Sequence, residues 1–332
     1  MEQMLVTGGA GFIGANFVHR ALAARPDLRL TVLDALTYAG NRDNLAEVGD
    51  WITFVHGDVR DGDLVDALVR DCDTVVHFAA ESHVDNSLQD PVPFLRTNVE
   101  GTFVLLEAVR RHDRRLHHVS TDEVFGSLPL HGGGAFTEET RYDPSSPYSA
   151  TKAASDLLVR AWARSYGVRA TLSNCANNYG PYQNVEKFLP RQITNVLHGR
   201  RPKLYGTGEN VREWTHVDDH NDAVLLILDA GRVGETYLIG SGAQWSNRAL
   251  LEVTLTLLGR PADDFDSVPD RPAHDLRYAC DSGKLRRELG WRPRWAELPD
   301  GLAATIDWYR GNEWWWGPQK ADTEARYAAI GR

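Results

Sequence analysis

A glycine-rich loop close to the N-terminus limits what this chain can fold into more than any other feature. The loop, Thr7-Gly8-Gly9-Ala10-Gly11-Phe12-Ile13-Gly14, follows a short apolar run and leads into residues with helical spacing. Glycines between a strand and a helix permit a tight turn and let the backbone approach a pyrophosphate, whose charge the helix N-terminus stabilises. The loop therefore predicts a βαβ unit that binds a dinucleotide.

Strand-like and helical segments alternate along the first half of the chain and become shorter and less regular after about residue 175. Apolar runs rich in β-branched residues predict strands at Met4–Thr7, Leu30–Leu33, Ile52–Val55, Thr74–Phe78, Leu116–Val119 and Arg169–Ser173. Helical spacing predicts helices at Phe12–Ala24, Leu64–Val69, Pro91–His112, Pro147–Tyr166, Phe188–His198, Asp218–Ala230, Asn247–Leu258 and Leu302–Arg310.

This alternation is typical of a mostly parallel sheet with helices on both faces and ligands at the carboxyl ends of its strands. We expect an α/β protein with a Rossmann-type doubly wound parallel sheet. Residues 1–175 would form the domain that binds the dinucleotide and carries the catalytic residues. Residues 176–332 would form a smaller C-terminal α/β lobe that binds the substrate, with some crossing of the chain between the two.

Charge and cysteine content exclude several classes of function. The 46 acidic and 36 basic residues give a net charge of −10, which opposes binding to nucleic acid or to anionic lipid. The N-terminal residues do not resemble a signal peptide, and no run of about 20 apolar residues predicts a membrane span. Cys72, Cys175 and Cys280 are far apart and have no partner at metal-ligand spacing, and the histidines form no metal pattern. We expect a cytoplasmic protein with reduced cysteines and no metal ion.

An acidic residue at the end of the second predicted strand indicates which dinucleotide binds. Asp34 lies twenty residues after Gly14, where its carboxylate can accept hydrogen bonds from the hydroxyls of an adenosine ribose. The same carboxylate would repel a 2′-phosphate, which favours NAD over NADP. Asp58 and Val59, after the third strand, are candidates for contacts to adenine.

Two further motifs carry catalytic chemistry. Tyr148 and Lys152 are four residues apart on a predicted helix and so share one face. An ammonium group and an oxidised nicotinamide would lower the phenol pKa from about 10, making Tyr148 a base for a sugar hydroxyl. Thr121, Asp122 and Glu123 follow the fifth strand at the ligand-binding edge of the sheet. Adjacent carboxylates push one pKa upward, so that one can serve as an acid and the other as a base.

Together these motifs resemble the extended short-chain dehydrogenase/reductase superfamily, and within it the dTDP-glucose 4,6-dehydratases. The resemblance covers nearly the whole chain, and the Asp-Glu pair after Thr121 is the feature that separates dehydratases from the related sugar epimerases. Segments that carry it include Asp34–Asn41, Ala79–Asp85, Asn177–Gln183, Glu186-Lys187, Val211–Trp214 and Asp270–Asp275.

The resemblance implies a reaction on dTDP-glucose with tightly bound NAD. Tyr148 would take the proton of the 4-hydroxyl as hydride leaves C4, with Thr121 beside it and Lys152 supporting it. Glu123 would remove the C5 proton, and Asp122 would protonate the departing C6 hydroxyl. Hydride return to C6 would give a 4-keto-6-deoxy sugar and regenerate NAD.

The resemblance also implies the binding residues. NAD would contact Gly8, Gly11, Phe12, Ile13, Gly14, Asp34, Ala35, Leu36, Thr37, Asp58, Val59, Phe78, Ala79, Ala80, Ser82, Thr97, Tyr148, Lys152 and Asn178. The nucleotide sugar would contact Ser82, Thr121, Asn177, Lys187, Phe188, Lys203, Leu204, Tyr205, Arg212, Asn247, Asp270, Arg271 and His274. Arg212 and Arg271 are candidates for bidentate contacts to the diphosphate. Helices Pro91–His112 and Pro147–Tyr166 would form a homodimer through a four-helix bundle.

Two other functions remain open at this stage. The same scaffold could carry a nucleotide-sugar 4-epimerase or a UDP-glucuronate decarboxylase, which need NAD but eliminate no water. A non-catalytic protein that senses or binds NAD is a third hypothesis, against which the intact Tyr148 and Lys152 pair argues.

Overall fold

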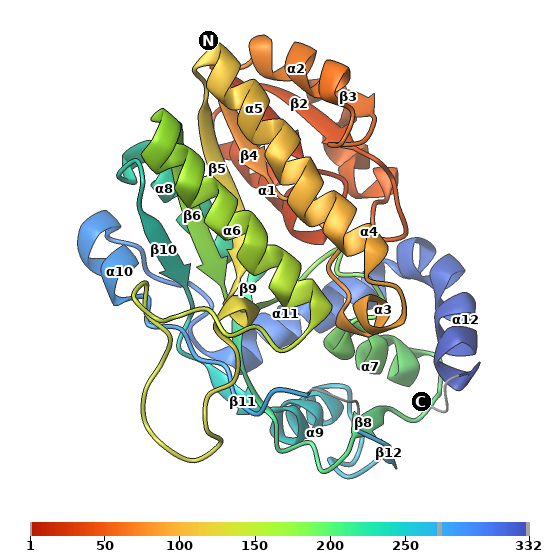
Figure 1. Cartoon of the computed structure of the whole chain (residues 1–332). Helices are drawn as coiled ribbons and strands as arrows, with labels where there is room; N and C mark the ends of the chain where they lie inside the picture. The colour runs from red at the N-terminus through yellow and green to blue at the C-terminus, as the bar shows by residue number, and fades with distance from the viewer. Residues whose placement is uncertain (1, 271–273, 330–332) are drawn as a thin grey trace.

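The computed structural model of this chain describes residues 2–270 and 274–329, and its centre is a seven-stranded parallel sheet in the order β10-β6-β5-β4-β1-β2-β3 (Figure 1). Its strands are β1 (Gln3–Thr7), β2 (Arg29–Asp34), β3 (Ile52–His56), β4 (Thr74–His77), β5 (Arg115–Thr121), β6 (Arg169–Cys175) and β10 (Thr236–Ile239). The predicted Rossmann-type doubly wound fold is confirmed. All seven strands end on one edge of the sheet, and the glycine loop, Asp34 and Thr121 lie on that edge.

Helices cover both faces of the sheet. One face carries α2 (Gly62–Arg70), α5 (Thr102–His112) and α6 (Pro147–Tyr166), and the other carries α1 (Phe12–Ala24) and α8 (Val217–Ala230). Successive strand residues point to opposite faces, so Leu5 packs with the first group and Val6 with the second. Because both faces are buried, the strands read as continuous apolar runs rather than as alternating ones.

Helix α6 begins and ends at residues that its sequence marks clearly. Ser146 and Ser149 form a reciprocal capping box, Pro147 occupies the first turn, and Gly167 ends the helix in the left-handed region at φ 71°. These signals fix the register of the helix, and therefore fix where Tyr148 and Lys152 lie along it.

The predicted helix Pro91–His112 is continuous but not uniform. Residues Val92–Phe94 form α4, Leu95–Gly101 follow as the π-helical segment η2, and Thr102–His112 form α5. The sequence pattern did not reveal the wider turns of the middle segment, which carries Thr97 and Asn98.

The second half of the chain adds smaller elements beside the carboxyl edge of the main sheet. Its strands are β7 (Asn177–Tyr179), β8 (Lys203–Tyr205), β9 (Val211–His216), β11 (Gln244–Ser246) and β12 (Asp266–Val268), which form a β11-β9-β7 sheet and a β12-β8 pair. Its helices are α7 (Phe188–Leu197), α9 (Asn247–Leu257), α10 (Gly283–Leu289), α11 (Leu298–Gly311) and α12 (Glu313–Ala329), and the short α3 (Val84–Gln89) lies nearby.

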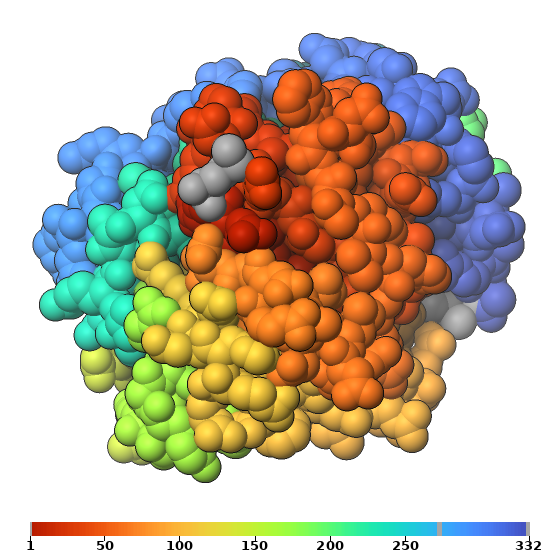
Figure 2. Space-filling view, turned by 90° about the horizontal axis from the view of Figure 1, so that it is seen from above, coloured from red at the N-terminus to blue at the C-terminus, as the bar shows by residue number. Residues whose placement is uncertain are grey.

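The chain crosses between its two halves. Strand β10 pairs with β6 in the main sheet, and α8 packs on α1. Seen from above, C-terminal segments lie on two sides of the N-terminal residues (Figure 2). The division at residue 175 stays a prediction, and this crossing means that cutting the chain there would remove an edge strand and a covering helix from the main sheet.

Candidate active site

The glycine loop has the close backbone approaches that its sequence predicts. Gly8 has φ +71°, and a Cβ atom there would lie 2.5 Å from the Ala79 nitrogen. A Cβ on Gly14 would lie 2.2 Å from the Gly8 carbonyl oxygen. Helix α1 begins after Gly11, and no side chain within the described residues caps its first amides. The loop thus leaves N–H groups at a helix N-terminus directed at the edge of the sheet.

Asp34 connects this loop to the end of β2. Its Oδ2 accepts a hydrogen bond from the Ala10 amide at 2.9 Å, and its Oδ1 accepts one from the Leu36 amide at 2.8 Å. Burial raises the Asp34 pKa, whereas these two hydrogen bonds lower it. Each carboxylate oxygen can accept a further hydrogen bond, such as one from a ribose hydroxyl.

A cavity of about 300 Å³ extends from the glycine loop to the end of β5. Every residue predicted to contact NAD lines it except Leu36, and so do the five predicted catalytic residues. The lining residues among the predictions are Gly8, Gly11, Phe12, Ile13, Gly14, Asp34, Ala35, Thr37, Asp58, Val59, Phe78, Ala79, Ala80, Ser82, Thr97, Thr121, Asp122, Glu123, Tyr148, Lys152 and Asn178. Leu36 instead packs against the apolar core with φ 49°, so its side chain is turned away from this cavity.

Asp122 and Glu123 are held at the point where β5 ends. Thr121 caps the short 3-10 helix η3 (Asp122–Phe125), since its hydroxyl oxygen accepts a hydrogen bond from the Glu123 amide at 3.2 Å. Asp122 is buried, and burial holds its pKa well above the usual range, with Glu123 and Glu213 acting in the same direction. A carboxyl group that keeps its proton near neutral pH can act as a proton donor.

Tyr148 and Lys152 lie on the face of α6 that is directed at the same cavity. The Lys152 ammonium donates to the Val119 carbonyl oxygen at 2.9 Å. Burial raises the pKa of Tyr148 well above its usual value, and the carboxylate of Glu123 adds to the effect. The sequence does not reveal this burial beside two carboxyl groups, and the lowering of the Tyr148 pKa by Lys152 and an oxidised nicotinamide stays a prediction.

A second cavity of about 170 Å³ meets the first near η3. Nine of the residues predicted to contact the nucleotide sugar line it: Ser82, Asn177, Lys187, Phe188, Lys203, Tyr205, Arg212, Asn247 and His274. Ser82, Glu123, Asn177, Glu186 and Lys187 line both cavities. Glu123, beside the buried Asp122, therefore lies where the two cavities join.

Four predicted substrate contacts do not line the second cavity. Leu204 is fully buried in an apolar cluster with Leu251, because alternate residues of β8 point to opposite sides. Asp270 accepts a hydrogen bond from the His274 ring at 2.7 Å and so acts on this cavity through a neighbour. Thr121 lines the first cavity. Arg271 lies outside the described residues.

Arg212 is oriented by contacts on two sides. One of its terminal nitrogens donates to the Asp275 carbonyl oxygen at 2.9 Å, and its guanidinium lies 4.2 Å from the centre of the Tyr278 ring. Stacking on an aromatic face fixes the plane of a guanidinium, which suits it to bidentate contact with an anion.

Several residues that line the second cavity were not predicted from the sequence. Glu186 is buried with a raised pKa caused mainly by burial, Tyr278 comes from the segment after His274, and Tyr327 comes from α12. Tyr327 donates to the Glu186 carbonyl oxygen at 2.8 Å. Glu186 belongs to a segment that carries the family resemblance, whereas no local motif marks Tyr278 and Tyr327, because only the packing of distant segments brings them to this cavity.

Metal-binding and membrane-spanning features are both missing from the described part of the chain. Within residues 2–270 and 274–329, no group of three or more His, Cys, Asp or Glu side chains is placed to hold a metal ion. No helix in the same residues has both the length and the apolar character needed to cross a membrane. Cys72, Cys175 and Cys280 are free and buried.

Comparison with known proteins agrees with this geometry. A family model described as GDP-mannose 4,6 dehydratase matches residues 5–303. The dTDP-glucose 4,6-dehydratase of Mycobacterium tuberculosis (strain ATCC 25618 / H37Rv) is 64% identical over 330 residues, covering 99% of this chain and 100% of that protein. The chain belongs to the dTDP-glucose 4,6-dehydratase family. The dTDP-glucose 4,6-dehydratase of Mycolicibacterium smegmatis is 63% identical over the same length.

Solved structures extend this result for the dehydratase family. The crystal structure of DesIV, a dTDP-glucose 4,6-dehydratase from Streptomyces venezuelae with NAD and TYD bound, matches with a TM-score of 0.92. It is 50% identical and covers 95% of this chain and 99% of its own. A UDP-glucose 4-epimerase of Thermus thermophilus in complex with NAD shares the fold at a TM-score of 0.85, but at 32% identity, covering 93% of this chain and 99% of its own.

Proposed function

We infer that this protein is an NAD-dependent hydro-lyase that converts dTDP-glucose to dTDP-4-keto-6-deoxyglucose and water. The junction of the two cavities carries this inference, because Glu123 lines both of them beside the buried Asp122. Tyr148 and Lys152 lie on the cofactor side of this junction. Similarity over the full chain to named dTDP-glucose 4,6-dehydratases supports the substrate.

The residues of the first cavity fit NAD. Gly8 and Gly14 leave no room for a Cβ atom where the backbone must approach a pyrophosphate, and no side chain of the described residues caps the first amides of α1. The Asp34 carboxylate is available to ribose hydroxyls and unfavourable to a 2′-phosphate. Bound at these residues, NAD would supply reversible hydride transfer to and from the sugar.

The chain's own residues would move the protons. Tyr148 would accept the proton of the 4-hydroxyl, with the Thr121 hydroxyl beside it. The 4-ketone acidifies the C5–H bond, so Glu123 could remove that proton. Asp122, with its raised pKa, would donate a proton to the departing C6 hydroxyl, and water would leave. The raised pKa of Asp122 suits it to donate a proton, whereas Tyr148 and Glu123 must be deprotonated when they accept one.

Diphosphate binding would rely on local positive charge, since the whole chain carries a net charge of −10. Arg212, Lys187 and Lys203 line the second cavity, and of these Arg212 has the fixed orientation suited to bidentate contact. Arg271 remains a candidate for the same role.

We also propose a cellular location, an oligomeric state and a division of the chain into two lobes, as the sequence leads us to expect. A cytoplasmic location agrees with a nucleotide-sugar substrate and with three reduced cysteines. A homodimer agrees with the apolar residues exposed along η2, α5 and α6. A division near residue 175 into cofactor and substrate lobes is supported by the cavity linings, since most residues of the first cavity precede residue 175 and most of the second follow it.

The direct test is incubation of the purified protein with dTDP-glucose, without added NAD, beside a parallel sample with UDP-glucose. The expected product has lost one water and gains a C6 methyl signal by NMR, which also means that NAD is retained through purification. An unchanged mass with inverted C4 would instead indicate a 4-epimerase. No reaction in either sample, even with NAD supplied, would refute the catalytic assignment.

A double variant separates the dehydratase from the other enzymes of this scaffold. Asp122→Asn with Glu123→Gln should abolish water loss, because both proton transfers of the elimination are removed. Oxidation at C4 depends on Tyr148 and should continue, so reduced nicotinamide should accumulate on the protein. A 4-epimerase or a UDP-glucuronate decarboxylase would keep most of its turnover in this variant.

A further inference from the structure

A buried carboxylate lies one helical turn beyond Lys152 on α6. Asp156 is 0% exposed and Lys152 is 4% exposed. The Oδ2 atom of Asp156 accepts three hydrogen bonds: from the Ser120 hydroxyl at 3.0 Å, the Tyr142 hydroxyl at 3.0 Å and the Asn174 amide at 2.9 Å. A fully buried carboxylate is stable only where hydrogen bonds and nearby positive charge offset its loss of water. The groups around Asp156 therefore show what keeps it ionised.

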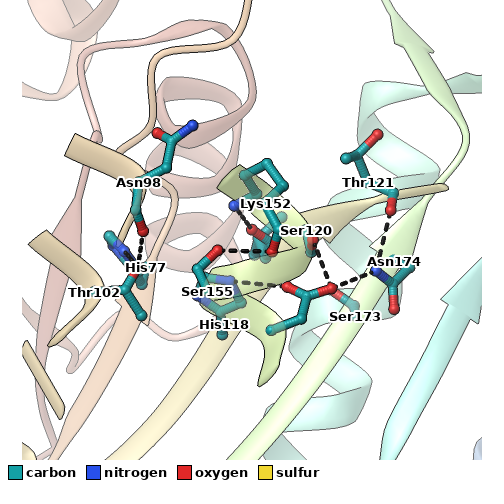
Figure 3. Close-up of polar contacts among 12 residues, drawn as sticks. His77, Asn98, Thr102, His118, Ser120, Thr121, Lys152, Ser155, Ser173 and Asn174 are labelled. Atoms are coloured by element: carbon teal, nitrogen blue, oxygen red, sulfur yellow. Dashed lines mark hydrogen bonds and ion pairs between the residues drawn. The ribbon is translucent and has the colours of Figure 1, made fainter. Parts of the chain in front are cut away.

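This carboxylate is connected to the strand end that carries the catalytic pair. The Asn174 side-chain amide that donates to Asp156 also donates to the Thr121 carbonyl oxygen at 3.0 Å. Ser120, the residue before Thr121, is held directly (Figure 3). Two consecutive residues of β5 are therefore fixed in place immediately before the chain turns into Asp122.

Asp156 also lies one helical turn from Lys152, and its negative charge favours the ionised form of that buried ammonium. The titratable groups around the Lys152 ammonium are His77 on β4, His118 on β5, Cys175 on β6 and Asp156 on its own helix. Burial, with the Lys152 charge adding to it, lowers the pKa of both histidines, and burial raises the pKa of Cys175 to about 12, so all three are neutral near pH 7. The Nε2 atom of His118 lies 3.2 Å from Asp156 Oδ1.

The balance of charges on Lys152 follows from these contacts. Burial lowers the pKa of Lys152, and Asp156 acts against this effect. Burial also disfavours the ionised form of Asp156, but His118, Lys152 and Asn174 outweigh it and lower the Asp156 pKa. Each member of the Lys152 and Asp156 pair thus keeps the other charged.

We propose that Asp156 is a positioning residue of this enzyme: it keeps the Lys152 ammonium charged and holds the strand end before Asp122. The proposal rests on the proposed function, because Lys152 matters through Tyr148. The titratable groups that bear on the Tyr148 phenol are Glu123, Cys175 and Asp122, and each opposes a phenolate. Lys152 lies four residues from Tyr148 on α6, so a charged Lys152 would favour the phenolate, and Asp156 maintains that charge.

A direct measurement follows the Lys152 side chain itself. The chain has only five lysines, so 13C labelling of the lysine ε carbons gives a simple NMR spectrum, in which a Lys152→Arg variant assigns the signal. We expect Lys152 in the wild-type protein to stay charged through neutral pH and to titrate at a clearly lower pH in Asp156→Asn. An unchanged midpoint overturns the proposal, as does a wild-type Lys152 that is already neutral at pH 7.

Asn is the right replacement because it retains the shape of the site. Its carbonyl oxygen can accept from Ser120, Tyr142 and Asn174, and its amide can donate to the neutral His118 ring. If Asp156→Asn does not fold, the wild-type titration alone still decides whether the buried ammonium is charged.

The kinetic counterpart is the pH profile of C4 oxidation. Loss of the Lys152 charge raises the Tyr148 pKa, so in Asp156→Asn the rise of kcat with pH should move to higher pH. If the midpoint moves by about one pH unit, kcat below the midpoint should fall about tenfold. The KM for dTDP-glucose should change little. Tyr142→Phe removes one hydrogen bond but no charge, and Asp219→Asn removes a buried carboxylate on α8, so both should leave the profile unchanged.

These experiments separate two kinds of failure. A profile that moves equally in Asp219→Asn, or not at all in Asp156→Asn, would reduce Asp156 to a structural role. A wild-type protein that leaves dTDP-glucose unchanged would refute the proposed function, whereas the NMR titration would still report on the pairing.

Discussion

The raised pKa that suits Asp122 to proton donation also lowers the free energy of unfolding of the protein. Burial, together with the charges of Glu123 and Glu213, holds its pKa well above the usual range. In the unfolded chain the same carboxyl releases its proton at a lower pH. The unfolded state therefore binds fewer protons between the two pKa values, and stability falls as the pH rises through this window.

Replacing this carboxyl should stabilise the protein. Asp122→Asn removes the ionisable group and keeps its shape, so we expect the free energy of unfolding to rise by about 1 to 3 kcal/mol near neutral pH, with the gain shrinking toward acid pH. Urea unfolding of both proteins at several pH values measures the difference. Equal stability at every pH would mean that Asp122 is not held protonated.

At this scale the sequence predicts those residues that belong to local motifs. The glycine loop, Asp34 and the Tyr148 and Lys152 pair are each marked by neighbours a few residues away, and the structure brings them to one cavity. Tyr278 and Tyr327 carry no such mark. The effect of burial on the Tyr148 pKa could not be predicted either, since only the folded chain creates that burial.

At the scale of elements, α12 is attached to α7 by a buried group of charges. Glu324 accepts hydrogen bonds from Arg191 at 3.1 Å and from Lys320 at 2.7 Å, and the Arg191 guanidinium lies 3.6 Å from the centre of the Tyr327 ring. Arg191 and Lys320 are almost fully buried. Glu324 is the shared counter-charge of two cations.

Removing that counter-charge should loosen the C-terminal helix. Glu324→Gln leaves two buried cations without this anion, so we expect a loss of about 3 to 5 kcal/mol in the free energy of unfolding. The matched control is Asp307→Asn, whose pair with Arg310 is exposed, and it should cost less than about 1 kcal/mol. The pKa of Glu324 is lowered, so the wild-type advantage should disappear as the pH falls through that pKa. Urea unfolding of the three proteins measures these losses, and similar losses in the two variants would contradict this account.

The elements themselves divide into predictable and unpredictable ones for physical reasons. Helix α6 has the predicted bounds because a capping box and a glycine mark its ends. Helix α12 was not predicted because Gly317 and Pro318 argue against a helix, and burial of Trp315 and Trp316 outweighs that local preference. Strands as short as β8 and β12 have too few residues for an alternation of apolar and polar side chains to be recognised.

At the scale of the whole molecule, the two halves of the chain complete one another. Strand β10 and helix α8 belong to the main sheet, while η3 from the first half lies against the second cavity. The substrate site therefore depends on segments from both halves. One face of this assembly, formed by η2, α5 and α6, still exposes large apolar side chains.

This face is where the proposed dimer can be tested. Leu95, Phe103 and Leu157 are each about half exposed, and α5 and α6 run side by side, so two copies related by a twofold axis would bring four helices together. Light scattering should give a mass twice the 37.1 kDa of one chain.

Leu95→Glu with Leu157→Glu should halve that mass, because each substitution would bury unpaired carboxylates at the contact. Val233→Glu changes an equally exposed residue between α8 and β10, outside these helices, and should leave the mass unchanged. A wild-type protein with the mass of one chain would refute the dimer, and a double variant that keeps the larger mass would place the contact on another face.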